Sequence, residues 1–403
     1  MIKSILQRRQ GKYRNKYFFL LISLSFAFYA LQLHTHWRLI SRFGMKGPKD
    51  FGDLRIILSA AKCGKNLGLQ IYEYQSGTCV YNYGDALIKI LNFLHLDNPA
   101  YTQAIAYFLI ISVIFSFCFL ILEVSEKFRF QNLVVALMLI CSPPVWLLFE
   151  RGNLDTLMFV LVTMTMALYI FNFRLLGNIV LTISVLIKFY TLPNIFFKLH
   201  KDRNRLYMLS SLTFFSIATI WVSIDLQKIY SGFSIPNPTY CAYGSPIVGL
   251  VLNKLFHFHI SKNLQLLLGL IILLLGVLAA EKLSEKLNSI KEFRTKLNNL
   301  SKNTFYIYKN FAIIYFFTFF TSMSFVYRLI FLLPVLYIFI VCAKFNFMNS
   351  LILLFSIWIS FEFYLFEIIG DALLFIIAIG IVWLAIPDNF FRFLKNYSRK
   401  SNL

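Results

Sequence analysis

The sequence predicts an all-α protein that crosses a membrane about ten times. Of its 403 residues, 59% are hydrophobic and only 14% are charged, whereas soluble domains average about 25% charged residues. Apolar runs of helix length recur from Phe18 to Trp383, and a helix needs about 20 apolar residues to cross a bilayer. A soluble enzyme, a disordered chain and a small secreted domain do not fit this composition.

The apolar runs form one continuous membrane domain over residues 1–403, with no second soluble domain. We divide it into a large external loop over 35–102, a core over 103–262 and C-terminal helices over 263–403. The first run is too long for a signal peptide and has no cleavage site, so we expect an uncleaved helix. The expected spans are 17–34, 103–122, 132–149, 154–172, 206–225, 263–280, 306–322, 325–343, 349–366 and 371–387.

Charge sets the expected orientation of these spans. The chain has 39 basic and 18 acidic residues, a net charge of +21, and the basic residues cluster in short loops between spans. Such loops lie in the cytoplasm and against anionic lipid. Both termini are therefore expected in the cytoplasm. Nucleic-acid binding is not expected, because no compact basic domain is present.

Residues 177–200 are expected to form a re-entrant pair of half-helices. The apolar runs before and after Lys188 each contain about ten residues, which is about half a bilayer at helical rise. Pro193 cannot continue a helix cleanly. Both ends of the pair would then be cytoplasmic, with Lys188 at its apex within the membrane.

The first external loop contains two amphipathic stretches, Asp53–Lys62 and Asp85–Leu96. Helices of this kind beside a span usually lie in the membrane interface. Cys63 and Cys79 could form a disulfide if this loop is extracytoplasmic. The sequence contains no CxxC spacing and no compact set of metal ligands. No cofactor is expected, and a divalent metal is optional but not indicated.

Charged residues at membrane depth are candidates for function because burying them is unfavourable. Lys188 is the clearest, and its ammonium suits a phosphate or carboxylate, although a snorkelling lysine is the alternative. Asp53, or alternatively Asp50, is either a helix N-cap or a general base at the membrane surface. The other candidates are Glu150, Arg151, Asn153 and Asp155 in the turn FERGNLD, and Arg328 at the start of a span. For each of these residues, the alternative is a solvated charge at the membrane interface.

Five segments resemble the GT-C glycosyltransferases, and most closely the polyprenyl-phosphate-mannose-dependent family GT87 (DUF2029). They are DLRIILSAAKCGKNLGLQIY (53–72), CVYNYG (79–84), ERGNLDTLMF (150–159), SVLIKFYTLP (184–193) and, more weakly, YGSPIVGLVLNKL (243–255). Two positions differ from the family pattern: Pro193 is displaced relative to Lys188, and Gly84 stands where the family usually has proline.

The resemblance implies a transferase on the outer side of a bacterial cytoplasmic membrane. A hexose, with mannose favoured, would pass with inversion from a polyprenyl-phosphate donor to a glycan or lipid acceptor. By motif, Asp53 would be the base. Lys188, Arg328 and Arg151 would bind the donor phosphate, whose developing charge needs cationic stabilisation. The substrate cavity would include Asn153, Asp155, Tyr81, Asn82, Tyr83 and Tyr327.

Three alternatives remain open. A polytopic transporter or lipid-linked-sugar flippase also needs many spans and intramembrane charge, but only one broken helix is visible, whereas transporters often have a pair. A lipid-linked polysaccharide polymerase or ligase would be expected to have its large loop late in the chain. For Lys188 itself, an ion pair with a neighbouring carboxylate such as Asp155 is the alternative to phosphate binding.

Overall fold

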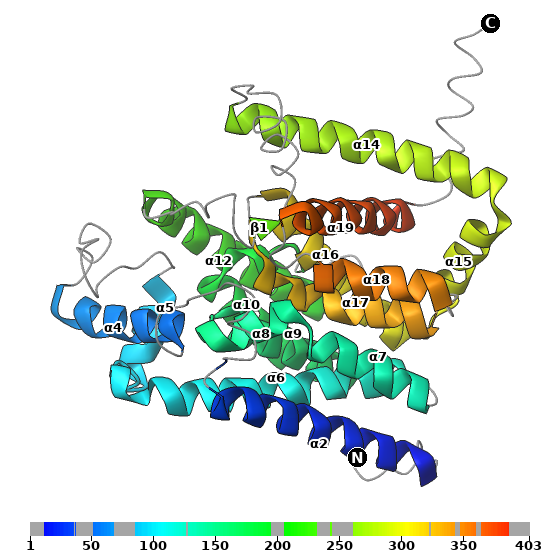
Figure 1. Ribbon diagram of the computed structural model, residues 1–403. Helices are drawn as coiled ribbons and strands as arrows, with labels where there is room; N and C mark the ends of the chain where they lie inside the picture. The colour runs from blue at the N-terminus through cyan, green and yellow to red at the C-terminus, as the bar shows by residue number, and fades with distance from the viewer. Residues whose placement is uncertain are drawn as a thin grey trace, which may run out of the picture.

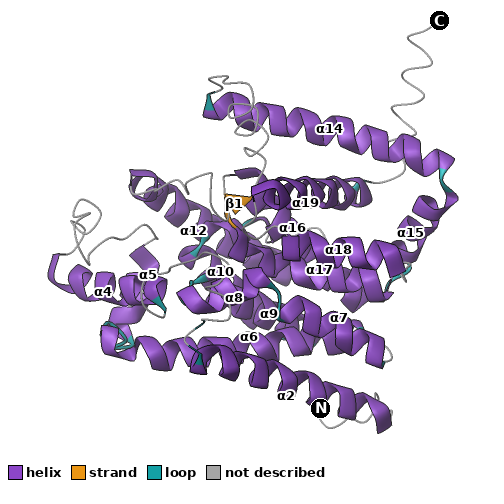
Figure 2. Ribbon diagram, viewed as in Figure 1, coloured by secondary structure: helices purple, strands orange, loops and turns teal. Residues whose placement is uncertain are grey.

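A computed structural model describes the chain over 12–35, 37, 51–67, 85–125, 128–194, 205–231, 242–243, 261–321, 324–342, 347–359 and 364–386. These residues are almost entirely helical (Figures 1 and 2). A short antiparallel ladder pairs β1 (Ala242–Tyr243) with β2 (Ser324–Phe325). The predicted all-α class is therefore confirmed for the described part of the chain.

The helices follow the expected order along the sequence. The first half contains α2 (Lys12–His34), α4 (Gly52–Leu67), α5 (Asp85–Phe93), η2 (Pro99–Tyr101), α6 (Thr102–Val124), α7 (Phe130–Ile140), α8 (Pro143–Arg151), α9 (Asp155–Ile170), α10 (Arg174–Ile187), η3 (Phe189–Thr191) and α12 (Arg205–Ser231). The second half contains α14 (Lys262–Lys286), α15 (Asn288–Asn298), α16 (Lys302–Thr321), η4 (Val326–Leu332), α17 (Leu333–Tyr337), a π-helical turn (Ile338–Cys342), α18 (Phe347–Ile359) and α19 (Tyr364–Ala385).

Among the described residues, three helices are long and apolar enough to cross a membrane: Lys16–His34, Pro99–Val124 and Leu267–Lys286. They coincide with three of the predicted spans. A fourth candidate is the bent pair α7 and α8. The other predicted spans correspond to α16 or to shorter apolar stretches, which lie in α9, α12, α18, α19 and the segment Tyr327–Val341. The count of ten stays a prediction.

Two predicted spans are not single straight helices. The stretch 132–149 is divided between α7 and α8, which meet at an angle of 48°. Pro143 and Pro144 begin α8; they donate no backbone hydrogen bond, and the residue before a proline is driven out of the helical region. Ser142 accordingly has an extended backbone. The stretch 325–343 begins as the 3₁₀ helix η4 and ends as the π-helical turn.

The expected break at Lys188 is present. Helix α10 ends at Ile187, Lys188 has the extended conformation φ −144° and ψ 117°, and η3 follows. The first half-helix is longer than expected, because it begins at Arg174; its 14 residues extend about 21 Å. The predicted return over 195–200 lies outside the described residues.

Both amphipathic stretches of the predicted first external loop form helices, α4 and α5, which pack against each other at one end of the bundle (Figure 1). The apolar side chains of α4 turn toward the protein core: Leu54, Ile57 and Leu58 are each less than 5% exposed. The neighbours of α4 are α5, α6 and α8. The amphipathic pattern of α4 is therefore explained by packing on protein, and its predicted place in the membrane interface stays a prediction.

The opposite end of the bundle is joined by a second group of polar contacts around Arg294 of α15. Its guanidinium lies 3.3 Å from Glu281 Oε2, donates to the Ile386 carbonyl and lies over the ring of Trp383. Trp383 Nε1 also donates to Glu281 Oε2, at 2.9 Å. These contacts connect α14, α15 and α19, far from α4 in Figure 1.

Candidate functional site

The turn between α8 and α9 carries three of the candidate side chains. Helix α8 ends at Arg151, and Gly152 follows in the left-handed conformation, φ 60° and ψ 37°. Glycine adopts this conformation without steric penalty and often ends a helix. The chain then reverses, so that Arg151, Asn153 and Asp155 leave the same short turn.

Gly152 also allows α4 to approach closely. A Cβ atom at this position would lie 3.0 Å from Phe51 Cβ and 3.1 Å from Leu54 Cβ. The Phe51 amide donates to the Glu150 carbonyl at 2.7 Å, and Phe51 itself has a positive φ of 62°. The start of α4 is thereby held against the end of α8, which brings Asp53 to Arg151.

Asp53 and Arg151 form the more exposed part of the site. Arg151 donates from Nε and Nη2 to Asp53 Oδ1 at 3.0 and 2.7 Å, a charge-assisted arrangement that fixes both groups. Asn153 Nδ2 donates to the other oxygen, Oδ2, at 2.7 Å. The Arg151 side chain is 37% exposed and that of Asp53 16%, so both remain within reach of a ligand.

Asp155 is the centre of the buried part. Its side chain is 0% exposed, and Lys188 Nζ and the Tyr190 hydroxyl both donate to Oδ1 at 2.5 Å. Arg328 Nε donates to Oδ2 at 3.4 Å. A fully buried carboxylate is tolerated only with such partners.

Tyr190 contacts all the charged members of this buried group. Its ring centroid lies 5.7 Å from Lys188 Nζ and 5.6 Å from Arg328 Cζ, within the range of a cation–π interaction. The ring also packs edge-on against Phe331 of η4. Tyr190 was not among the residues predicted from the sequence; the available signal was its position two residues after Lys188, within the string SVLIKFYTLP.

The break after α10 presents Lys188 and Tyr190 to Asp155. The Lys188 amide donates to the Ser184 carbonyl at 2.9 Å, which ends the helix. Across the break, Ser184 Oγ and Thr191 Oγ1 lie 3.1 Å apart, and Thr191 Oγ1 donates to the Lys188 carbonyl at 3.2 Å. These hydroxyls satisfy polar groups that the broken helix exposes.

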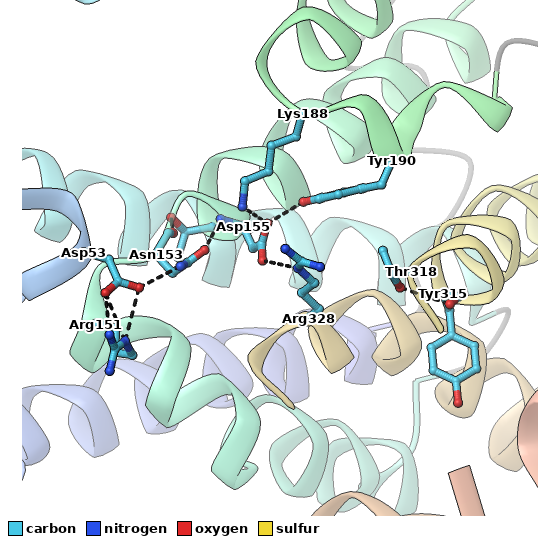
Figure 3. A network of polar contacts seen from close by, with 10 residues as sticks. Asp53, Arg151, Asn153, Asp155, Lys188, Tyr190, Tyr315, Thr318 and Arg328 are labelled. Atoms are coloured by element: carbon cyan, nitrogen blue, oxygen red, sulfur yellow. Dashed lines mark hydrogen bonds and ion pairs between the residues drawn. The ribbon is translucent and has the colours of Figure 1, made fainter. Parts of the chain in front are cut away.

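Asn153 connects the exposed and buried parts into one network (Figure 3). Its amide nitrogen donates to Asp53, and its amide oxygen accepts from the Asp155 backbone N–H at 3.0 Å. The network contains three cations and two carboxylates, and the neighbouring Glu150 carboxylate also interacts with Arg151. Arg151, at the accessible side, presents a positive charge that suits an anion.

The structure brings together six of the predicted residues: Asp53, Arg151, Asn153, Asp155, Lys188 and Arg328. Tyr327 precedes Arg328 on η4 and is 5% exposed. Asp50, Tyr81, Asn82 and Tyr83 lie outside the described residues. Within the described part of the chain, no three His, Cys, Asp or Glu side chains are grouped so as to hold a metal ion.

The Asp155 carboxylate lies between Lys188 and Arg328 and compensates the charge of both cations. Donor-phosphate binding by these two residues stays a prediction. The ion pair named as the alternative for Lys188 is the arrangement present.

Comparisons with models of protein families, with curated proteins and with solved structures each find no match to this chain.

Proposed function

We propose that this protein is a membrane glycosyltransferase that moves a hexose, with mannose favoured, from a polyprenyl-phosphate donor to an extracytoplasmic glycan or lipid. The observation that carries the proposal is the Asp53–Arg151 pair at the accessible side of a cationic network. A carboxylate that can accept a proton and a guanidinium that can bind a phosphate are adjacent there. Transfer from a lipid phosphate needs both groups.

Exposure suggests how the roles are divided. Lys188 is 6% exposed and engaged with Asp155, so it holds the Asp155 carboxylate in place. Arg328 is 18% exposed and Arg151 37%. Arg151, assisted by Arg328, is therefore a better phosphate ligand than Lys188. Lys188 stabilises the site through its ion pair with Asp155.

In this scheme Asp53 removes the proton from the acceptor hydroxyl as the new glycosidic bond forms. The bond between the sugar and the donor phosphate breaks, and the polyprenyl phosphate leaves with additional negative charge. Guanidinium groups placed beside the leaving oxygen stabilise that charge in the transition state. Attack from the face opposite the phosphate inverts the anomeric carbon.

Two features favour an extracytoplasmic site. Cys63, near the end of α4, is disulfide-bonded, and disulfides persist in oxidising compartments outside the cytoplasm. Arg294, in the basic connection between the predicted spans 263–280 and 306–322 that is expected to be cytoplasmic, makes its contacts at the other end of the bundle. With Asp53 at the outer end, the site would meet a donor from the outer leaflet and an acceptor outside the cell.

The test is transfer in proteoliposomes that contain the purified protein, radiolabelled polyprenyl-phosphate mannose and a mixture of extracytoplasmic glycan and lipid acceptors. Asp53→Asn is expected to abolish transfer while leaving folding and donor binding intact. The control is Asp97→Asn, which changes another carboxylate of the same external loop and should transfer normally. Wild-type turnover by Asp53→Asn would overturn the role of Asp53.

The same vesicles distinguish a flippase. A flippase would move the donor between leaflets and leave the sugar–phosphate bond intact. Donor that changes leaflet without loss of its sugar, in the presence of acceptor, would replace the transferase proposal.

A further inference from the structure

We propose that Asn153 is a positioning residue that orients the Asp53 carboxylate and couples it to the buried Lys188–Asp155–Arg328 cluster. The inference rests on the proposed function in assigning Asp53 to proton transfer. It departs from the expectation that Asn153 lines the substrate cavity, because Asn153 is 1% exposed. A side chain that is so deeply buried acts through its neighbours.

The hydrogen bonds of Asn153 fix the orientation of its amide. The Asp155 backbone N–H is only a donor, so the group that faces it at 3.0 Å must be the amide oxygen. The NH₂ group must then face Asp53 Oδ2, at 2.7 Å. Asn153 has no freedom to flip without breaking both contacts.

The backbone of Asn153 is equally constrained. Its N–H donates to the Leu148 carbonyl at 3.1 Å. Its carbonyl accepts from the backbone N–H and the hydroxyl of Thr156, at 3.0 and 2.7 Å. The side chain is thus mounted on a rigid turn between α8 and α9, as a residue that positions a reacting group must be.

The consequence for Asp53 is a defined direction for its remaining lone pairs. Arg151 binds mainly Oδ1 and Asn153 binds Oδ2, so the plane of the carboxylate is set from two sides. An acceptor hydroxyl then meets an oxygen of known orientation. Small errors in such an alignment reduce the rate of transfer strongly.

The charge environment of Asp53 comes from several elements. Arg151 of α8 and Lys188, which follows α10, interact with Asp53, and Glu150 of α8 and Tyr327 of η4 interact in turn with Arg151. The neighbouring helices carry Asp85 and Lys89 on α5, Tyr107 on α6 and Arg55 on α4 itself. Asn153 is the neutral donor among the groups that directly contact the carboxylate.

Asn153→Asp is the most informative substitution. Aspartate can still accept from the Asp155 backbone N–H, so this N–H at the start of α9 keeps its hydrogen-bond partner. The other oxygen of the introduced carboxylate would face Asp53 Oδ2, in the place of the NH₂ group with which Asn153 donates to Asp53. Two carboxylates at this distance retain one proton between them, so the pH–rate profile of this variant should differ from that of the wild type.

Asn153→Ala removes both hydrogen bonds of the side chain. We expect kcat to fall by at least about tenfold, with the donor KM changed little, because Asn153 does not touch the donor. The matched control is Asn310→Ala, which removes another buried asparagine that donates to a backbone carbonyl away from the site. It should leave both kcat and the pH profile unchanged.

An infrared measurement tests the positioning role without any assumption about activity. Difference spectra between each protein and its Asp53→Asn counterpart isolate the carboxylate stretch of Asp53. In Asn153→Asp the pH dependence of this band should change, because the two carboxylates share a proton. In Asn153→Ala its frequency should shift. If Asn153→Asp does not fold, Asn153→Ser retains an oxygen that can accept from the Asp155 N–H but is too short to reach Asp53, and should shift the band as alanine does.

The outcomes separate the two proposals. An Asp53 band that is unchanged in frequency and pH dependence in every Asn153 variant would overturn the positioning role, whatever the activity. If the wild-type protein transfers no sugar while the Asn153 variants show the infrared shifts, the proposed function is overturned. The coupling of Asn153 to Asp53 is then retained.

Discussion

Lys188 Nζ lies 2.5 Å from Asp155 Oδ1, and these residues join the break after α10 to the first turn of α9. Both side chains are almost completely buried. Removing one partner of a buried ion pair leaves the other charge without compensation, which destabilises a protein more than removal of the pair. The pair therefore supports the site structurally as well as electrostatically.

Lys188→Met is expected to lower the free energy of unfolding by about 3 kcal/mol. Tyr190 and Arg328 continue to bind Asp155 and keep the loss from being larger. Combining it with Asp155→Asn should recover part of the loss, since the stranded charge is gone. Thermal unfolding in detergent measures both variants.

The control for this prediction is Lys296→Met. Lys296 pairs with Glu292 on the exposed face of α15, where ion pairs contribute about 0–1 kcal/mol. A Lys188→Met protein as stable as this control would show that the buried pair contributes little. It would also revive phosphate binding as the principal role of Lys188.

Tyr190→Phe tests the hydroxyl separately from the ring. It removes the hydrogen bond to Asp155 but keeps the aromatic face for Lys188 and Arg328. A hydrogen bond to a charged group contributes about 1.5–3 kcal/mol, and the loss of stability should fall in this range. Tyr190→Leu should lose more.

Tyr101→Phe provides the comparison, because Tyr101 is 46% exposed at the start of α6. Its unfolding temperature should match the wild type. Equal stability of Tyr190→Phe and Tyr190→Leu would contradict a contribution from the ring.

Gly152→Ala is expected to separate α4 from α8. The left-handed backbone costs a non-glycine residue about 1–2 kcal/mol, and the new Cβ would press on Phe51 and Leu54. Stability should fall by at least that amount. In the protein that still folds, transfer should fall as well, because Asp53 is displaced from Arg151.

Gly380→Ala is the matched control. Gly380 lies inside α19, with no atom within 4 Å of an added Cβ, and alanine is favoured over glycine in a helix by about 1 kcal/mol. Its stability should equal or exceed that of the wild type. A Gly152→Ala protein that behaves like Gly380→Ala would contradict the close packing of α4 on the turn.

The re-entrant path predicts that the two flanks of residues 177–200 face the same side. Leu175→Cys and Lys201→Cys should both react with a membrane-impermeant maleimide only from the cytoplasmic side, in inverted vesicles. Phe93→Cys, at the end of α5 and 82% exposed in the wild type, should react from outside. Reaction of positions 175 and 201 from opposite sides would show a complete span instead.

The sequence alone was sufficient for the helical class, the candidate charges and the position of the broken helix. Apolar runs, amphipathic periodicity and a lysine between two short runs are local patterns, and each reports on nearby backbone. They correctly indicated α4, α5 and the break at Lys188. The bend between α7 and α8 also has a local sequence signal, Pro143 and Pro144. The apolar run around these prolines nevertheless favoured the prediction of one continuous span.

Only the tertiary structure decided which charges meet. Asp53 lies 98 residues from Arg151, and Asp155 lies 173 residues from Arg328; spacing along a chain does not determine which acid pairs with which base over such separations. Tyr190 could not be recognised for the same reason, since its role depends on Asp155 and Arg328 from other elements. Packing brought these groups together, because buried charges are stable only where a partner neutralises them and hydrogen bonds satisfy the rest.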